Sequence, residues 1–356
     1  MLDWARRRYP KEPSDSDFVY KQTIKAKACD ALRGILPAAT LSNVGIYGTG
    51  QGYEALLLRM RAHPLPEARR YADLMLTELR KVVPSFLTRV DRPERGGAWS
   101  QYLRDTRDHT ADVVHRVFGR ETAEPRPGVT LVDFDPEGED KVLAAVCYPH
   151  TNLPEDQLLA KVRTLGTDER VALLRAYVGE RANRRHKPGR AFERTDYRFD
   201  VLADYGAFRD LQRHRMLTIE WQPLSPAHGY DMPEPVVEAD VTEAYAKAMD
   251  VSAALYGAMA FRFPEQASYA VSLAYRLRFV MQMNAREAMH LIELRTTPQG
   301  HPSYRVVAQE MHRLIAEEAG HRAIAAAMRF VDHGTYDLER LESERAAEQR
   351  RTAPRT

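Results

Sequence analysis

Cysteine is scarce, since the 356-residue chain has only Cys29 and Cys147. Two widely separated cysteines argue against a disulfide scaffold or a zinc site and favour a reducing compartment. Long apolar runs are also lacking. No stretch approaches the roughly 20 residues that a membrane-spanning helix needs, and the first residues have no apolar segment typical of a signal peptide. We therefore expect a cytoplasmic protein with no membrane partner and no metal.

A strong excess of either charge is absent as well. The 52 basic and 50 acidic residues leave a net charge of +2, so nothing at this level requires a nucleic acid or a membrane surface. The charge is nevertheless uneven, because residues 181–194 are strongly basic and residues after 341 are almost all charged. A charge run is usually a solvated face, and nucleic acid is therefore the least favoured partner.

The N-terminal region reads as helical. Residues 23–36 are expected to form a helix that ends at Pro37, because proline cannot continue the helical hydrogen bonds. A glycine-rich segment, residues 44–50, leads into a helical run over 53–60. Pro66 has the first-turn position that proline favours and opens a further amphipathic helix.

Further along, residues 93–127 are rich in proline, glycine and charge and are predicted to be a linker. Strands are expected at 129–134 and 197–203, and short helices over 156–178. Residues 207–220 could form a strand or a helix, and Asp240 and Glu243 have the spacing of a capping box before a helix at 243–259. Residues 266–294 are expected to be largely helical. Residues 302–330 are expected to form an amphipathic helix that is interrupted near Gly320.

An internal repeat relates the two ends of the chain at a constant offset of 236 residues. The matching pairs are Leu58 and Leu294, Arg59 and Arg295, Pro66 and Pro302, Arg69 and Arg305, Ala72 and Ala308, and Met75 and Met311. Two unrelated amphipathic helices that both begin with proline are the alternative. Six matches in register favour a repeat, in which residues 23–90 are a partial copy of residues 265–330.

Two polar clusters could carry chemistry. Arg213, His214 and Arg215 follow an apolar approach, and guanidinium groups bind phosphate oxygens through paired donors. Taken alone, this triplet is better explained as a solvated basic turn. The second cluster is Asn284, Arg286, His290 and Arg295, with 286 and 290 one helical turn apart. Its equally weighted alternative is a surface face of arginines paired with Glu287 and Glu293.

Together, and in this order, the clusters resemble the motifs of flavin-dependent thymidylate synthases. That family carries Arg-His-Arg, and later Asn-Ala-Arg followed by an apolar helix that ends in Leu-Arg. Here the matching segments are RHR at 213–215 and NAREAMHLIELR at 284–295, supported upstream by AAVCY at 144–148 and ERTDYRF at 193–199. The resemblance covers about residues 128–330.

The resemblance implies an α+β fold, with a mixed sheet and a helical layer, assembled as a homo-oligomer (dimer or tetramer) with FAD at subunit interfaces. It implies reductive methylation of dUMP to dTMP, with methylenetetrahydrofolate as carbon donor and NADPH as reductant. Arg295 matches the arginine that stabilises the ionised pyrimidine. Positions that match flavin contacts are Arg213, His214, Arg215, Asn284, Arg286 and His290.

The N-terminal region resembles the latter half of the same family domain. ALRGILP at 31–37 and the Leu-Arg at 58–59 match its segments, so the resemblance predicts one and a half domains in tandem. We expect a partial repeat at 1–92, a linker at 93–127, a full domain at 128–335 and a charged tail at 336–356. Arg33 and Arg59 would then supply substrate-binding residues to a site whose flavin residues come from the full domain.

The chain departs from the family pattern around the nucleotide. The family serine that follows Arg-His-Arg after seven intervening residues falls on Pro223. The nearby arginine falls on Ser225, and the glutamate on Trp221, next to Glu220. Ser225 and Glu220 are the candidates to replace the lost groups in substrate binding. The altered loop leaves two alternatives open: a flavoenzyme that acts on another pyrimidine nucleotide, and a non-catalytic relative that binds nucleotide or nucleic acid.

Overall fold

The computed structural model describes residues 1–338 and 340–352. The chain divides into two compact units, and each is described by itself. The first unit comprises residues 1–38, 126–256 and 268–356, and the second comprises residues 39–125 and 257–267. None of the helices in the described part of the chain has the length and apolar character that crossing a bilayer requires.

The first unit is built on a four-stranded sheet with the strand order β1-β2-β4-β3. Its strands are β1 (Val129–Phe134), β2 (Asp196–Asp204), β3 (Thr218–Trp221) and β4 (Arg276–Asn284), and every neighbouring pair is antiparallel. The helices of this unit are α1 (Leu2–Arg8), α2 (Asp17–Leu32), α7 (Gly138–Cys147), α8 (Glu155–Val162), α9 (Thr167–Val178), α10 (Tyr205–Leu211), α11 (Glu234–Glu238), most of α12 (Thr242–Ala260), α14 (Ala285–Arg295), α15 (Pro302–Glu317), α16 (Arg322–Ala327) and α17 (Leu341–Thr352).

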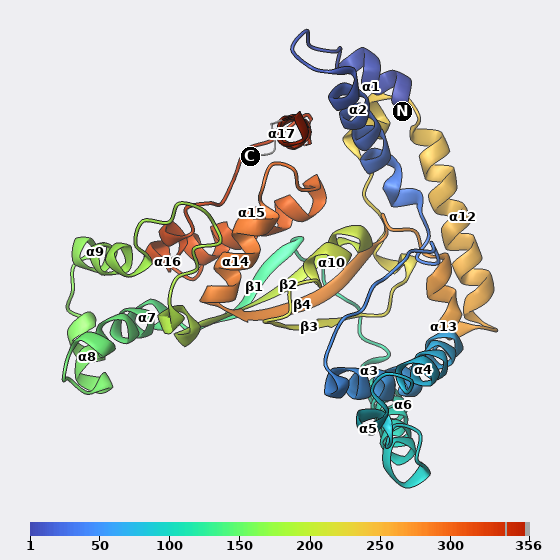
Figure 1. The fold of residues 1–356 in the computed structure, drawn as a ribbon, viewed down its shortest axis with the longest axis horizontal. Coiled ribbons are helices and arrows are strands. Elements are labelled where there is room, and N and C mark those ends of the chain that lie inside the picture. Colours follow the sequence, from blue (N-terminus) through green and yellow to red (C-terminus); the bar gives the residue numbers. More distant parts are fainter. Residues whose placement is uncertain (339, 353–356) are drawn as a thin grey trace. The chain divides into compact units, whose positions relative to one another are not determined.

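The long central strands β2 and β4 hold the core of the first unit. Tyr197 pairs with Met283, and Phe199 pairs with Met281, so that large buried side chains of both strands share one face. Helix α15 packs against β1 and β2, and α14 packs against α15 (Figure 1). The sheet and its helical layer therefore hold the end of β4 and the start of α14 in a fixed position.

Capping residues set where α14 and α15 begin. The Oδ1 atom of Asn284 accepts a hydrogen bond from the backbone N–H of Glu287 at 2.9 Å and so caps α14. Helix α15 begins at Pro302, with His301 as its capping residue. A left-handed Gly320, with φ of 72°, separates α15 from α16.

The N-terminal part of the first unit joins the sheet region through backbone pairing. The segment that ends α2 lies antiparallel to residues 271–274, with hydrogen bonds from Leu273 N to Leu36 O at 2.9 Å and from Ala38 N to Val271 O at 2.8 Å. Gly34 is required here, because a Cβ at this position would lie 2.3 Å from Tyr245 Oη. This pairing places residue 33 in the same unit as the Arg-His-Arg segment.

The second unit is helical. It contains α3 (Gly50–Ala62), α4 (Pro66–Leu79), α5 (Pro84–Leu87), a π-helical turn at Pro93–Gly97, α6 (Ala98–Phe118) and α13 (Pro264–Ala267). The core lies between α3, α4 and the following turn, and its buried members are Leu57, Leu58, Ala72, Leu76, Leu87 and Val90. Helix α4 begins at Pro66 and α15 at Pro302, so the expected 236-residue offset holds at both helix starts.

Several sequence expectations hold. Helices begin or end at Pro37, Pro66 and Gly320 much as predicted, β1 and β2 lie where strands were expected, and α14 carries positions 286 and 290. Cys29 and Cys147 are free thiols. The α+β class with a helical layer is confirmed, although the sheet is antiparallel throughout and not mixed, because both central strands run against all of their neighbours.

The largest error concerns residues 266–294, which were expected to be helical. Residues 276–284 form β4 instead, at the centre of the sheet. Their buried and less buried side chains alternate along the strand, as the period of two requires, but both kinds include bulky apolar residues. That composition hides the alternation and suggests a buried helix.

The structure differs from the sequence expectations in three smaller ways, each of which concerns a short segment. Residues 98–118, inside the expected linker, form the 21-residue helix α6, whose exposed surface suits its charged composition. Asp240 does not cap α12, which begins at Thr242; its φ of 55° belongs to the turn that ends α11. Part of the expected charged tail forms α17, where Arg345 donates to Asp15 at 2.7 Å.

Candidate active site

The Arg-His-Arg segment forms a turn between α10 and β3. Asp204 caps α10 by accepting a hydrogen bond from Ala207 N at 2.7 Å, so the helix starts directly at the end of β2. Leu211 is fully buried and fixes the far end of α10. As a result His214 points inward and is 7% exposed, whereas Arg213 and Arg215 remain exposed. The solvated basic turn therefore describes the two arginines but not the histidine.

His214 is the centre of a hydrogen-bonded chain that connects the turn to α14. Its Nδ1 atom lies 3.0 Å from Glu287 Oε1, and its Nε2 atom lies 3.0 Å from Arg295 Nε. Glu287 is 8% exposed, and the Arg295 side chain is 12% exposed. Burial lowers the pKa of Arg295, and the nearby Asp210 opposes that shift.

Asp210 gathers three arginines around one carboxylate. Arg213 Nη1 lies 3.4 Å and Arg295 Nη1 3.8 Å from Oδ1 of Asp210, while Arg33 Nη1 lies 3.9 Å from Oδ2. One acid cannot neutralise three guanidinium groups, so this side of the site keeps net positive charge. Arg33 Nη2 is buried without a hydrogen-bond partner among the described residues. Such an arrangement favours an anionic ligand.

The remaining predicted flavin residues surround the start of α14. Arg286 donates from Nε to Pro188 O and from Nη1 to Glu193 Oε1, both at 3.0 Å. The His290 ring lies 5.5 Å from the His214 ring in an edge-on arrangement. Burial lowers the pKa of His290, with Glu287 acting in the opposite direction, which favours a neutral ring at physiological pH.

The structure also tests the surface alternative for this helix. Glu287 is 8% exposed and Glu293 is 1% exposed, so the two acids are buried and are not a solvated face. Glu293 forms a paired ion contact with the equally buried Arg181, with oxygen–nitrogen distances of 2.7 and 2.6 Å. The surface interpretation of this cluster is therefore wrong, because both acids face the interior.

The substrate-binding candidates lie in different places. Arg33 belongs to the Asp210 cluster described above. Ser225 accepts a hydrogen bond from Ala227 N at 3.4 Å and caps the short 3-10 turn Pro226–His228, and Glu220 is an exposed residue of β3. Arg59 is an exposed residue of α3 in the second unit, so the cluster within the first unit is built without it.

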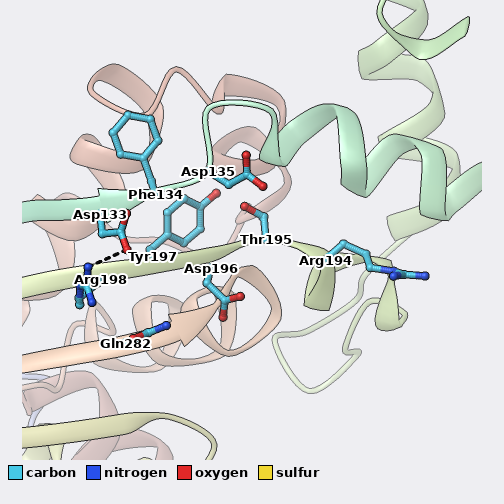
Figure 2. Close-up of a pocket in the computed structure, with 9 residues that line it drawn as sticks. All are labelled: Asp133, Phe134, Asp135, Arg194, Thr195, Asp196, Tyr197, Arg198 and Gln282. Atoms are coloured by element: carbon cyan, nitrogen blue, oxygen red, sulfur yellow. Dashed lines mark hydrogen bonds and ion pairs between the residues drawn. The ribbon is translucent and has the colours of Figure 1, made fainter. Parts of the chain in front are cut away.

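Two of the hollows formed by described residues of the first unit lie near predicted site residues. The larger, of about 800 Å³, is lined by Arg33 together with Asp204, Tyr245 and Ser303. The smaller, of about 200 Å³, lies beside the ends of β2 and β4. Figure 2 shows that Asp135, Thr195 and Tyr197 turn toward one another there, whereas Arg194 extends away. Neither Arg295 nor His214 lines either of these two hollows.

Sequence reasoning missed Asp210 as a site residue and gave Glu287 only a surface role. Asp210, near the end of α10, lies three residues before Arg213 in the following turn, and the two form an ion pair. Glu287 lies three residues before His290 on α14. An acidic residue three positions before a predicted basic site residue therefore indicated a second site residue in both cases. The sequence did not indicate that Glu287 is buried.

His214, Glu287 and His290 are close enough to bind a metal ion, since their ligand atoms lie within 4.8 Å of one another. Both ring nitrogens of His214 already have hydrogen-bond partners, however, and one of these partners is the cation Arg295. Arg295 would compete with a metal for Nε2. We therefore interpret the group as a hydrogen-bonded network.

The donors present fit a flavin dinucleotide. Exposed Arg213 and Arg215 offer cationic donors of the kind that bind a diphosphate. Arg33, with its unpartnered buried nitrogen, is a further donor for an anion.

The fold and this cluster define an α+β protein with a cationic site that suits a phosphorylated ligand. Residues 130–320, more than half of the chain, match the family of thymidylate synthase complementing proteins. The chain belongs to this family, which is the flavin-dependent one.

The chain also resembles UPF0159 proteins. It is 37% identical to one from Chlamydia pneumoniae over 96% of this chain and 64% of the relative, and 34% identical to one from Thermoplasma acidophilum over 91% and 64%. It thus spans less than two thirds of these relatives' length. A solved UMP/dUMP methylase from Streptomyces cacaoi, bound with 5-Br dUMP, is 19% identical and aligns with a TM-score of 0.45, covering 56% of this chain and 94% of the methylase.

Proposed function

We propose that the protein is an enzyme that methylates dUMP to dTMP reductively, using FAD, methylenetetrahydrofolate and NADPH. The single observation that supports this most strongly is the buried contact between His214 and Arg295, which joins the two family motifs into one site. Family membership supports the flavin. The three arginines around Asp210 support a phosphorylated substrate.

In this proposal Arg295 is the catalytic residue. Its guanidinium is largely buried and is oriented from two sides, by His214 Nε2 and by Asp210. A fixed cation in a partly desolvated site stabilises negative charge that develops on a pyrimidine better than a mobile surface cation would. Arg295 would therefore hold the ionised pyrimidine without reorganising during the reaction.

The other site residues would bind and orient. When bound, the flavin supplies redox chemistry by carrying a hydride. Arg213, His214, Arg215, Asn284, Arg286 and His290 would hold it, with Asn284 and Arg286 acting mainly through the start of α14. Arg33, Glu220 and Ser225 would contact the nucleotide, and Arg59 of the second unit remains a further candidate. A homo-oligomer would complete the site.

A second candidate is the same chemistry on another pyrimidine nucleotide. Pro223 occupies the position of the family serine, and Ser225 is already engaged as a cap, so the nucleotide loop differs from the family pattern. This loop would contact the base and the phosphate. Selectivity could therefore shift without loss of the flavin residues.

The test is a turnover assay of the whole chain with FAD, NADPH and methylenetetrahydrofolate, and with dUMP, UMP or dCMP as the acceptor. Methylation of dUMP above the other two acceptors supports the first proposal, and preference for another nucleotide supports the second. A folded protein that binds flavin but methylates none of them would contradict both. The control is Arg295→Ala, which should lower kcat/KM for the preferred nucleotide by about 10²–10³-fold.

A further inference from the structure

We propose that Glu287 is a positioning residue that fixes the proton of His214 on Nδ1 and thereby locks Arg295 in place. The effect of Glu287 on catalysis rests on the function proposed above, whereas the position of the proton on His214 does not depend on that function. The inference follows from the identity of the groups on either side of one buried imidazole.

The donors and acceptors along the chain allow only one arrangement of a neutral ring. Arg295 Nε always carries a proton and can only donate, so His214 Nε2 must accept and must be unprotonated. Glu287, as an ionised carboxylate, can only accept, so His214 Nδ1 must carry the proton that it donates. A histidine with protons on both nitrogens would point an N–H group at the N–H of Arg295.

Burial strengthens the dependence of each group in this arrangement on its hydrogen-bond partner. His214 and Glu287 are 7% and 8% exposed, so water can barely replace a lost partner. An imidazole tautomer is set by the hydrogen bond that its other nitrogen makes. Glu287 therefore acts on Arg295 through the His214 ring that lies between them.

Two neighbours complete the support. Asp210 Oδ1 lies 3.8 Å from Nη1 of Arg295, and the guanidinium carbon lies 5.4 Å from the centre of the Tyr304 ring. Arg295 is thus held by three contacts, of which only the histidine contact depends on a proton that can move. Glu287 is the group that decides where that proton lies.

The experiment is nitrogen NMR of the full-length protein with ¹⁵N-labelled histidine, without any added flavin. The chain has 12 histidines, and the signal absent from His214→Asn identifies the ring. The expected result is a His214 protonated on Nδ1 alone at pH 7. A ring protonated on Nε2, or on both nitrogens, would overturn the proposal.

Glu287→Gln then tests the link to Arg295. An amide can accept or donate, so the proton is no longer fixed, and the Nδ1-protonated fraction should fall. We expect kcat/KM to fall about tenfold in the wild-type background and to change little in an Arg295→Ala background, because coupled residues are not additive. Equal losses in both backgrounds would contradict positioning.

Glu310→Gln is the matched control. It removes one carboxylate from the neighbouring helix α15, where Glu310 pairs with Arg313 on the surface, and should leave the His214 signal and kcat/KM unchanged. If the wild-type proton lies on Nδ1 but dUMP is not methylated, the proposed function fails while the proton assignment stands. The two failures are therefore distinguishable.

Discussion

The helix pair α3–α4 and the helix pair α14–α15 have the same plan but different surroundings. In each pair the second helix begins with proline, at Pro66 and Pro302, and a Leu-Arg step lies near the end of the first helix. Arg295 is largely buried among His214, Asp210 and Tyr304, whereas Arg59 at the matching position is exposed. The two helix pairs thus have a common arrangement, and the residues that pack against α14–α15 give that pair its buried arginine.

The difference starts where the first helix of each pair begins. Helix α14 follows directly from β4 and is capped by Asn284, whereas α3 follows a glycine-rich loop and is capped by Thr49. The sheet places the Arg-His-Arg turn beside α14. Position 293 of α14 holds a buried glutamate, and position 57 of α3, 236 residues earlier, holds a buried leucine. The two helix pairs therefore differ at this position, where α14 buries a charged side chain and α3 buries an apolar one.

The largest expected effect separates the two arginines. We expect Arg295→Ala to lower kcat/KM for the preferred nucleotide by about 10²–10³-fold, because it removes a fixed cation from the charge that develops in the transition state. Arg59→Ala should have a smaller effect, expressed mainly in KM. Steady-state kinetics of both variants provide the measurement, and equal losses would mean that both helix pairs contribute alike.

The next effect concerns the buried positions 293 and 57. Glu293→Ala should cost about 3–5 kcal/mol of unfolding free energy, because it leaves Arg181 buried without its carboxylate. Leu57→Ala should cost about 2–5 kcal/mol through the cavity it leaves. Urea unfolding measures both, and hydrogen exchange should place the two losses in different units. A loss below about 1 kcal/mol for Glu293→Ala would contradict a buried ion pair.

A smaller effect depends on pH. Burial and the nearby Arg33 lower the pKa of His301 to about 3, so the unfolded chain binds a proton below about pH 6.5 that the folded chain does not. His301 therefore costs stability as the pH falls from about 6.5 toward 3. The loss from this group should be about 2 kcal/mol at pH 5.

His301→Asn should remove this loss while keeping a side chain that can cap α15. The change in unfolding free energy between pH 7 and pH 5 provides the measurement. Leu65 has the matching position before α4 and caps nothing, so Leu65→Asn is the control and should leave the pH dependence unaltered. If His301→Asn lost as much stability in acid as the wild type, the histidine would not be the proton-linked group.

The smallest effect compares the two caps. Asn284→Ala and Thr49→Ala should each cost about 1 kcal/mol, because each leaves a first-turn N–H without its acceptor. Only Asn284→Ala should also weaken FAD binding, since it loosens the start of α14. Thermal unfolding and flavin titration measure the two quantities. Flavin affinity that was unchanged by Asn284→Ala would remove this residue from the cofactor site.

The helix ends and the two polar clusters could be predicted from the sequence, whereas strand β4 and the roles of Asp210 and Glu287 depend on tertiary structure. Proline and glycine fixed where helices begin and end, and the two polar clusters identified one side of the site. Strand β4 was missed because both of its faces carry bulky residues, so local pattern and hydrophobicity gave conflicting signals. The roles of Asp210 and Glu287 depend on partners 85 and 73 residues away, at Arg295 and His214, which no local pattern contains.

The most direct test of the proposed site is the visible absorbance of the purified chain with FAD, recorded before and after addition of dUMP. We predict that the protein retains the flavin and that dUMP shifts its spectrum, because both ligands would meet at the His214–Arg295 contact. Arg295→Ala should retain the flavin and lose the shift. A folded wild-type protein that binds no flavin would contradict the account.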